Sequence, residues 1–286
     1  MIQFLKYRYV CLVASIVMIA AGVVGYVHFK GFRYSVDFTG GTQVRFSSSK
    51  QIGSERLKEI LAAHGWNDPL IREFDNNDVV VRVPEFTHDS QGLAQKIRDV
   101  VQDKLTDTHI AILEANAVGP GVGQTLRLNA FLMGLYIILA MLLYIAFRFW
   151  SWSYGVGVVV ALLHDAIGLL ALLVLTQKEI SPNVICAILA TLGYSMNDTI
   201  VILSQVRKNF VKMKDVSPYV VVNTSINQTL RRTLLTSFAT ALMVGSLFLF
   251  GGETLRGLTF TLLVGIVIGT YSSVYVASPI MLLLKR

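Results

Sequence analysis

Long runs of apolar residues alternate with short charged connections along most of the chain. A helix needs about 20 mainly apolar residues to cross the roughly 30 Å hydrocarbon core of a membrane. The polar stretch at residues 28–125 is the only long interruption of this pattern. The pattern therefore predicts six membrane helices and one inserted domain outside the membrane. The six apolar runs are residues 9–27, 129–147, 154–175, 180–203, 233–250 and 258–284.

These runs divide the chain into three parts. Residues 1–27 form an N-terminal tail and the first membrane helix, and residues 28–125 form the outer domain. Residues 126–286 hold helices two to six, with a cytoplasmic loop at 204–232. A cleaved signal peptide is the alternative for the first run. That run is longer than the usual 7 to 15 residue apolar region and lacks a clear cleavage site, which favours a retained membrane helix.

The composition agrees with a membrane protein, because 53% of the residues are hydrophobic, 15% are charged and the mean hydropathy is +0.58. This balance excludes a soluble metabolic enzyme and a disordered tail. The net charge of +7 does not indicate a nucleic-acid partner here, since the location of charges matters more in a membrane protein. Cys11 and Cys186 lie inside apolar runs without a His/Cys cluster, so we expect packing residues and no metal site. The sequence has no phosphate loop and no nucleophile–base pair, and we expect neither enzyme activity nor a cofactor.

The distribution of charge predicts the orientation of the helices. With the N-terminus inside, the cytoplasmic segments carry eleven Lys and Arg residues against one acid, Asp215. The opposite short loops hold two basic and two acidic residues. Because basic loops stay in the cytoplasm, both termini are predicted there. The large domain, with 11 basic and 13 acidic residues, is nearly neutral and is predicted outside.

The outer domain shows strand and helix patterns in a regular order. Alternation of apolar and polar residues predicts strands, and apolar residues at helical spacing predict two amphipathic helices. Ser54 is expected to cap the first helix, Gly65 to stop it, and residues 75–78 to form a turn. The order β-α-β-β-α-β is the ferredoxin-like split motif, an α+β fold that carries no activity by itself. The strands are residues 42–47, 69–74, 79–83 and 109–117, and the helices are residues 54–64 and 90–105.

Two glycine-rich segments flank this domain. Asp37, Gly40 and Gly41 lie in a segment that allows a tight backbone turn after the first membrane helix. A plain turn into the first strand and a functional hinge both remain open for it. Residues 119–123 are predicted to join the domain to the second span, either as a hinge or as a simple connector.

Ionisable residues inside the spans point to function. A charged residue at a helix centre costs about 2.5–3.5 kcal/mol on insertion scales and is normally kept for a reason. Asp198 in the fourth span and Arg232 at the start of the fifth both lie in the cytoplasmic half of the bilayer, where they could meet. A carboxylate near a guanidinium in a low-dielectric cavity is suited to bind and release a proton. A structural ion pair that only holds the helices together is the alternative.

Other polar and small residues in the spans have simpler explanations. His164 and Asp165 occur together in the third span, where His164 could hydrogen-bond a neighbouring helix. Arg232, Thr236 and Thr240 recur every four residues and should share one helical face. Gly265 and Gly269 form a GxxxG pattern, for which close helix packing is the default explanation. Residues 218–230 carry an apolar stripe after a Ser-Pro start and predict an interfacial helix on the cytoplasmic surface.

A series of motifs resembles the SecD/SecF family of protein-export membrane proteins. The outer domain follows the first span, and the motifs occur in the family's order along nearly the whole chain. They are DFTGGT at 37–42, VGPGVG at 118–123, HD at 164–165, GYSMNDTIVI at 193–202, QTLRRTLLTS at 228–237, FGGETLRG at 250–257 and GTYSSVYVASP at 269–279.

The resemblance implies a specific assembly and activity. The family belongs to the resistance-nodulation-division superfamily, so the chain would be one six-helix half paired with a second half, SecD. The pair would lie beside the SecYEG channel in the bacterial cytoplasmic membrane, among its lipids, and use the proton-motive force to draw exported preproteins outward. The proton-pathway acid and arginine would be Asp198 and Arg232, with Asn197, Thr233 and Asp165 as neighbours of that path.

One segment departs from the family pattern. After its NDT motif the family usually continues with an acidic residue and a DRIRE-like stretch. This chain has LSQVRK at 203–208 instead. The charge pairing at the cytoplasmic end is therefore expected to differ.

Three hypotheses follow. The first is a proton-coupled accessory subunit of the protein translocase. The second is half of a proton-coupled exporter of small molecules or lipids. The third is a purely structural partner that stabilises the channel or SecD, in which case Gly265 and Gly269 would matter more than Asp198.

Overall fold

A computed structural model describes residues 1–286 except 51, 67–68, 74–76, 106–107, 150 and 286. The chain forms two compact units. The helical unit comprises Met1–Arg33 and Leu132–Arg286, and the α/β unit comprises Tyr34–Phe131. The division falls inside one long helix, α5 (Pro120–Phe149), which begins in the α/β unit and ends in the helical unit.

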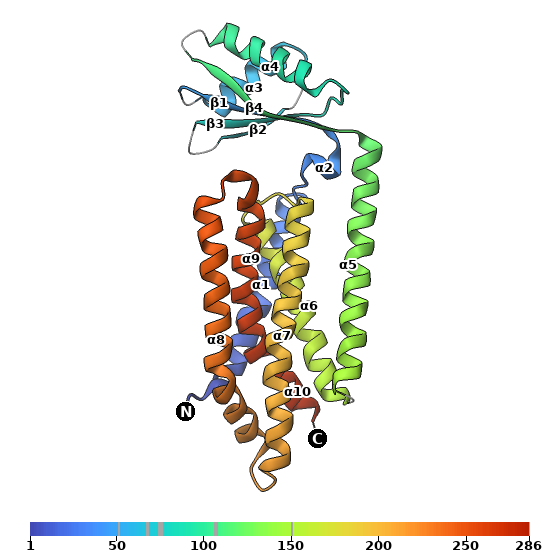
Figure 1. The fold of residues 1–286 in the computed structure, drawn as a ribbon, viewed down its shortest axis with the longest axis vertical. Coiled ribbons are helices and arrows are strands. Elements are labelled where there is room, and N and C mark those ends of the chain that lie inside the picture. Colours follow the sequence, from blue (N-terminus) through green and yellow to red (C-terminus); the bar gives the residue numbers. More distant parts are fainter. Residues whose placement is uncertain (51, 67–68, 74–76, 106–107, 150, 286) are drawn as a thin grey trace. The chain divides into compact units, whose positions relative to one another are not determined.

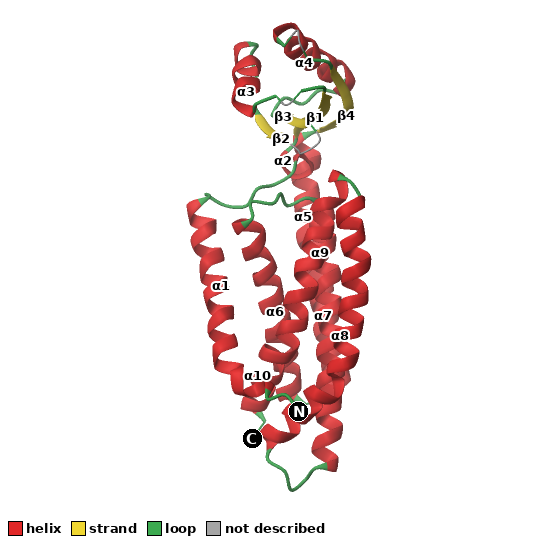
Figure 2. Cartoon of the chain, turned by 90° about the vertical axis from the view of Figure 1, so that its left-hand side faces the viewer, coloured by secondary structure: helices red, strands yellow, loops and turns green. Residues whose placement is uncertain are grey.

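The helical unit contains the membrane spans, except for the first part of α5. Within the described residues six helices are long and apolar enough to cross a membrane, which confirms the predicted number (Figure 1). Both chain ends lie at the same end of this unit as the connection between α7 and α8 (Figure 2). Besides α5, the helical elements are η1 (Phe4–Tyr7), α1 (Arg8–His28), α6 (Trp152–Leu175), α7 (Pro182–Lys212), α8 (Pro218–Phe250), α9 (Glu253–Ser272), the π-helical turn η2 (Ser273–Ala277) and α10 (Ser278–Leu284).

Local chemistry fixes several helix ends. Ser181 caps α7 by accepting a hydrogen bond from the Val184 amide at 3.3 Å, and Pro182 occupies the first turn, where its missing N–H costs nothing. Pro218 opens α8 in the same way. The sixth span is continuous through η2, where the Ser278 hydroxyl donates to the Ser273 carbonyl at 3.0 Å. Such π-helical turns occur mostly as local insertions in α-helices.

Side-chain packing at the end that holds the termini corrects one prediction. Residues 218–230 do not form a separate interfacial helix, because α8 runs without a break from Pro218 to Phe250. Val222 and Ile226 are buried in an apolar core with Leu5, Phe149 and the other residues of this cluster. The stripe seen in the sequence therefore packs against the chain's own helices.

The α/β unit has the predicted order of elements. In the part of this unit that the structure describes, four antiparallel strands form a sheet in the order β2-β3-β1-β4, and two helices pack with its apolar core. This arrangement confirms the βαββαβ motif. Its strands are β1 (Gly41–Ser48), β2 (Leu70–Glu73), β3 (Asp78–Val83) and β4 (Ile110–Val118), and its helices are the short α2 (Val36–Thr39), α3 (Ser54–Ala63) and α4 (Ser90–Lys104).

Three local predictions need correction or completion. Gly53, not Ser54, is the N-cap of α3, and the Ser54 amide donates to the Glu73 carboxylate. The predicted turn at 75–78 lies partly outside the described residues. The glycine-rich joint at 119–123 is not a free linker, because α5 already begins at Pro120. A side chain at Gly123 would press on the Phe38 carbonyl oxygen at 3.0 Å, so this glycine permits a close contact.

Candidate functional site

Asp198 lies on the buried side of α7. Only 3% of its surface is exposed, and Ser195 and Thr199 on the same helix are also buried. Asn197 is on the exposed side of α7, although it is the next residue. Successive residues on a helix are separated by about 100°, since 3.6 residues make one turn. Asp198 therefore faces the neighbouring helices, while Asn197 faces away from them.

Helix α8 supplies the other half of this site. Thr233 and Ser237, one turn apart, are buried, and Asp198 interacts with the Ser237 hydroxyl and with the charge of Arg232. The Ser237 and Thr270 hydroxyls are 2.8 Å apart and join α8 to α9. Arg232 and Thr236 are exposed, and Thr236 donates to the Arg232 carbonyl at 3.1 Å. The buried face of α8 is thus the one with Thr233 and Ser237, one residue away from the face that the sequence suggested.

Several buried polar atoms at this site lack partners within the described part of the chain. They are the Asp198 Oδ2 atom, the Thr199 and Thr233 hydroxyls and the Tyr194 hydroxyl. Buried polar atoms are normally hydrogen-bonded, and those that are not call for an explanation. These atoms are therefore available to bind a proton or water.

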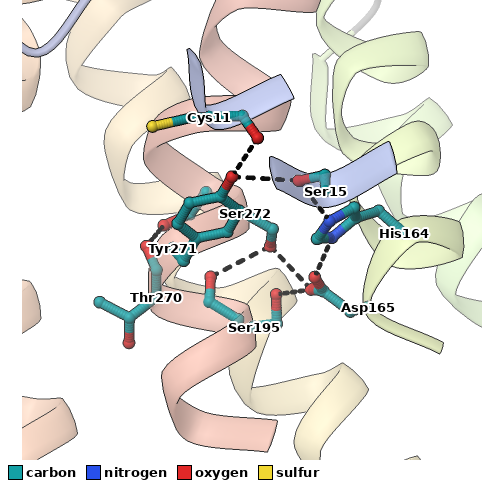
Figure 3. Close-up of polar contacts among 10 residues, drawn as sticks. Cys11, Ser15, His164, Asp165, Ser195, Thr270, Tyr271 and Ser272 are labelled. Atoms are coloured by element: carbon teal, nitrogen blue, oxygen red, sulfur yellow. Dashed lines mark hydrogen bonds and ion pairs between the residues drawn. The ribbon is translucent and has the colours of Figure 1, made fainter. Parts of the chain in front are cut away.

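A second carboxylate, Asp165, lies in a separate polar network on α6 (Figure 3). It is 2% exposed, and its Oδ2 atom accepts hydrogen bonds from Ser195 of α7 and, at 2.9 Å, from Ser272 of α9. Its Oδ1 atom lies 3.0 Å from His164 Nδ1. The side chain therefore holds together α6, α7 and α9.

The same network reaches α1 through His164. His164 Nε2 lies 2.9 Å from the Ser15 hydroxyl, which lies 3.0 Å from the Tyr271 hydroxyl (Figure 3). Tyr271 in turn donates to the Cys11 carbonyl at 2.5 Å. A chain of polar contacts thus connects α1 to α6 and α9 in the interior of the helical unit.

The glycines of α9 bring it against α7 next to both carboxylates. A side chain at Gly265 would meet Thr191, with its Cβ only 2.7 Å from the Thr191 Cβ. At Gly269 it would meet the Ser195 Cβ at 2.7 Å. Any residue larger than glycine would force these helices apart.

The segment that departs from the family pattern, and Asn209 directly after it, make hydrogen bonds to neighbouring helices. Asn209 donates to Ser225 and to Gln228, both at 2.8 Å, and Gln205 donates to Gln228 at 2.8 Å. Arg148 donates to Ser204 at 3.0 Å. Amides and hydroxyls therefore join α7 and α8 where charge pairing was expected to differ.

The glycine motif of the first loop belongs to the α/β unit. Gly40 and Gly41 have φ angles of 75° and 110°, which side-chain-bearing residues rarely adopt. A side chain at Gly41 would lie 2.6 Å from the Val83 carbonyl oxygen of β3. Asp37 accepts a hydrogen bond from Ser35 at 2.9 Å and belongs to the short helix α2. Both glycines are thus required by the backbone at the entry to β1.

The described residues contain no group of three His, Cys, Asp or Glu side chains that could hold a metal ion. Cys11 and Cys186 are both free thiols. Sequence reasoning located both membrane carboxylates but missed their hydroxyl partners Ser195 and Ser237. Sequence spacing gives no signal for the Ser195 contact, because Ser195 bonds to Asp165 on a different helix.

Comparison with known families decides the affiliation. A model of the family "Protein export membrane protein SecD/SecF, C-terminal" matches residues 98–286, and one of the SecD/SecF GG motif matches residues 27–52. The chain belongs to the SecD/SecF family. Its membership confirms the resemblance drawn from the motifs and makes it a multi-pass bacterial membrane protein.

Relatives of this SecD/SecF member cover nearly all of it. The protein translocase subunit SecF of Escherichia coli O157:H7 is 35% identical over 94% of this chain and 83% of its own length. The subunit of the same name from Rhodothermus marinus is 36% identical over 99% of this chain and 92% of its own.

Solved structures agree with this affiliation. The crystal structure of SecDF, a translocon-associated membrane protein from Thermus, matches with a TM-score of 0.88 and 32% identity over 99% of this chain. SecDF in a form described as super-membrane-facing matches with a TM-score of 0.72. This chain spans 38% of the length of the first SecDF structure and 39% of the second.

Proposed function

We propose that this chain is an accessory subunit of the Sec protein translocase that works with SecD and uses the proton-motive force through Asp198. It is a transport subunit and not an enzyme. In this account Asp198 binds and releases a proton, Arg232 is its charge partner and Thr233 borders the path, whereas Asn197 faces away from it and Asp165 belongs to the separate network. The SecF names of the relatives and the SecDF match support the translocase role.

The burial of Asp198 is the observation that carries the proposal. An ionised carboxylate is costly to bury without full pairing, and Oδ2 of Asp198 has no hydrogen-bond partner in the described chain. Binding a proton removes that charge, so protonation changes the forces between α7 and α8. Moving one charge through 100 mV is worth about 2.3 kcal/mol, which is enough to bias a conformational equilibrium in each cycle.

The exposed side of α8 supports a partner within the membrane. It carries Arg232 together with large apolar side chains that the chain's own helices leave uncovered. An apolar face that begins with two cations, Arg231 and Arg232, suits a second bundle of membrane helices better than lipid, because lipid tails offer the guanidinium groups no partner. We assign this face to SecD. The apolar side chains are Leu234, Leu235, Phe238, Leu242 and Met243.

The remaining partners follow from this role. The complex would lie beside SecYEG in the bacterial cytoplasmic membrane, surrounded by its lipids, with both termini in the cytoplasm. The α/β unit would then face outward and act on the exported preprotein. A shift in the helices driven by Asp198 would be passed to this unit through the chain segments that connect them.

Export in cells that lack the native subunit tests the proposal. We expect Asp198→Asn and Arg232→Gln to reduce export to the level of cells without the subunit, while SecD still co-purifies with each variant. Asp215→Asn is the matched control, because it makes the same chemical change at an exposed loop position. Normal export by an assembled Asp198→Asn variant would contradict the proposal.

The same experiment distinguishes this proposal from the structural hypothesis and from the exporter hypothesis. A purely structural subunit predicts that Asp198→Asn is silent and that Gly265→Val abolishes both assembly and export. An exporter half predicts normal protein export for all variants, with a defect only in the extrusion of small molecules or lipids.

A further inference from the structure

The network around His164 and Asp165 fixes where its hydrogen atoms lie. Tyr271 donates its only hydroxyl proton to the Cys11 carbonyl, since a carbonyl oxygen can only accept a hydrogen bond. In the contact between Ser15 and Tyr271, Ser15 must therefore be the donor. The Ser15 hydroxyl then has no proton left for His164, so His164 Nε2 must carry a proton and donate it to Ser15.

The other ring nitrogen of His164 leads to the main conclusion. Nδ1 faces Asp165 Oδ1 at 3.0 Å, a distance at which two lone pairs would repel one another. A proton must lie between them, on either atom. With Nε2 already protonated, the pair is then either imidazolium with carboxylate or imidazole with carboxylic acid, and both forms have zero net charge.

We infer that His164 and Asp165 form a second proton-binding site in the membrane, which holds one proton between Nδ1 and Oδ1 and thereby ties α1 to the rest of the bundle. Loss of this proton would leave a buried net negative charge and two opposed lone pairs. It would weaken the contact between α6 and the Ser15 side of α1. The site is distinct from Asp198, which lies one helical turn beyond Ser195 on α7.

The surroundings suit a single shared proton. The titratable group that contacts the pair is Tyr271 on α9, and Cys11 on α1 and Tyr275 on η2 lie against Tyr271. From α7 the uncharged Ser195 faces Asp165, with Tyr194 and Asp198 as the nearest ionisable groups along that helix. The proton is thus held by His164 and Asp165 alone, and Ser195 and Ser272 fix the carboxylate in position.

The position of α1 in the chain links the proton site to the α/β unit. Helix α1 ends at His28, and the α/β unit begins at Tyr34. If the proton stabilises the position of α1, a change at the membrane site would be transmitted to the α/β unit through the chain that connects the two. This consequence rests on the proposed proton-coupled function, whereas the proton-binding site itself does not.

Nitrogen NMR of the histidine ring tests the site directly. In the complex with SecD in lipid nanodiscs, with only this chain labelled with ¹⁵N-histidine, five histidines would give signals, and His164→Gln identifies the relevant one. At pH 7 we expect a protonated Nε2 and an Nδ1 that shares a proton with Asp165. In Asp165→Asn the ring should be neutral, with a proton on Nε2 and none on Nδ1. An unprotonated Nε2 in the wild type, or an Nδ1 that keeps a full proton in Asp165→Asn, would overturn the inference.

Hydrogen exchange of the α1 amides tests whether the shared proton stabilises that helix. His164→Gln leaves a buried, unpaired carboxylate, so exchange near Ser15 should rise about tenfold or more, equivalent to about 1.4 kcal/mol. The double variant His164→Gln with Asp165→Asn removes the charge and should return most of the protection. His28→Gln, an exposed control on the same helix, should have no effect. A double variant that exchanges faster than the single one would indicate loss of packing only and reject the site.

Neither measurement requires a proton gradient or export. Failure here would leave the role of Asp198 untouched, and failure of the Asp198 export test would leave this site standing.

Discussion

At the residue scale, one backbone position in the α/β unit depends on glycine for two independent reasons. Gly41 has a φ of 110°, and the Val83 carbonyl of the paired strand occupies the space that a side chain would need. The Gly-Gly pair was enough to predict a turn from the sequence. The Val83 carbonyl oxygen, which excludes a side chain at Gly41, could not be predicted, because it belongs to a strand about forty residues away in the chain.

Gly41→Ala should therefore destabilise the α/β unit. We expect a cost of about 1–3 kcal/mol, the range for a residue held in a sparsely populated backbone conformation. Hydrogen exchange of the β1 and β3 amides in the full chain measures it. Gly121→Ala, where no atom lies within 4 Å of the added methyl group, is the control and should leave exchange unchanged. Equal protection in both variants would show that the turn tolerates a side chain.

The two membrane carboxylates show what single residues reveal. Asp165 and Asp198 could be selected from the sequence because a charge inside an apolar run is costly and therefore rare. Their hydroxyl partners could not be selected in the same way. Serine and threonine are common in membrane helices, where they often bond to their own backbone, as Thr236 does here. Only the packing of the helices separates Ser237 from Thr236.

At the element scale, helices α7 and α9 approach closely through the two glycines of the GxxxG pattern. We expect Gly269→Val to lower the melting temperature of the purified complex, with a cost of about 1–3 kcal/mol for overpacking. Gly134→Val is the control, since nothing lies within 4 Å of its added Cβ atom on α5. If both variants melt at the same temperature, the close approach does not contribute to stability.

The amide contact between α7 and α8 is a second test at this scale. Asn209→Ala removes the donor to Ser225 and Gln228, and each lost hydrogen bond is worth about 0.5–1.5 kcal/mol. The exposed neighbour Lys208→Ala should cost nothing measurable. Denaturant unfolding of the full chain compares the two. An Asn209→Ala variant as stable as Lys208→Ala would show that the contact is dispensable.

The elements also show where sequence patterns stop being sufficient. The start of α8 at Pro218 was predicted correctly, but the pattern suggested that a new helix begins near residue 233. Arg231 and Arg232 interrupt the hydrophobicity at that point without interrupting the helix, since arginine is a good helix former. Hydrophobic patterns therefore locate membrane spans more reliably than they locate helix ends.

At the scale of the whole molecule, an even number of spans places both chain ends on the same side of the membrane. The basic loops predict that this side is the cytoplasm. Epitope tags at both termini should be protected from external protease in spheroplasts and cleaved in inverted vesicles. A tag inserted in the exposed α4 surface of the α/β unit should show the opposite pattern. Cleavage of a terminal tag in intact spheroplasts would contradict this orientation.

The central claim is that Asp198 couples proton movement to protein export, and one measurement tests it most directly. Vesicles that contain SecYEG, SecD and this chain would export a preprotein with and without an imposed proton gradient. Wild type should show a gradient-dependent increase that Asp198→Asn lacks, although the variant assembles and exports normally without a gradient. A full gradient-dependent increase in the assembled Asp198→Asn variant would contradict the account, and energy would then enter the complex elsewhere.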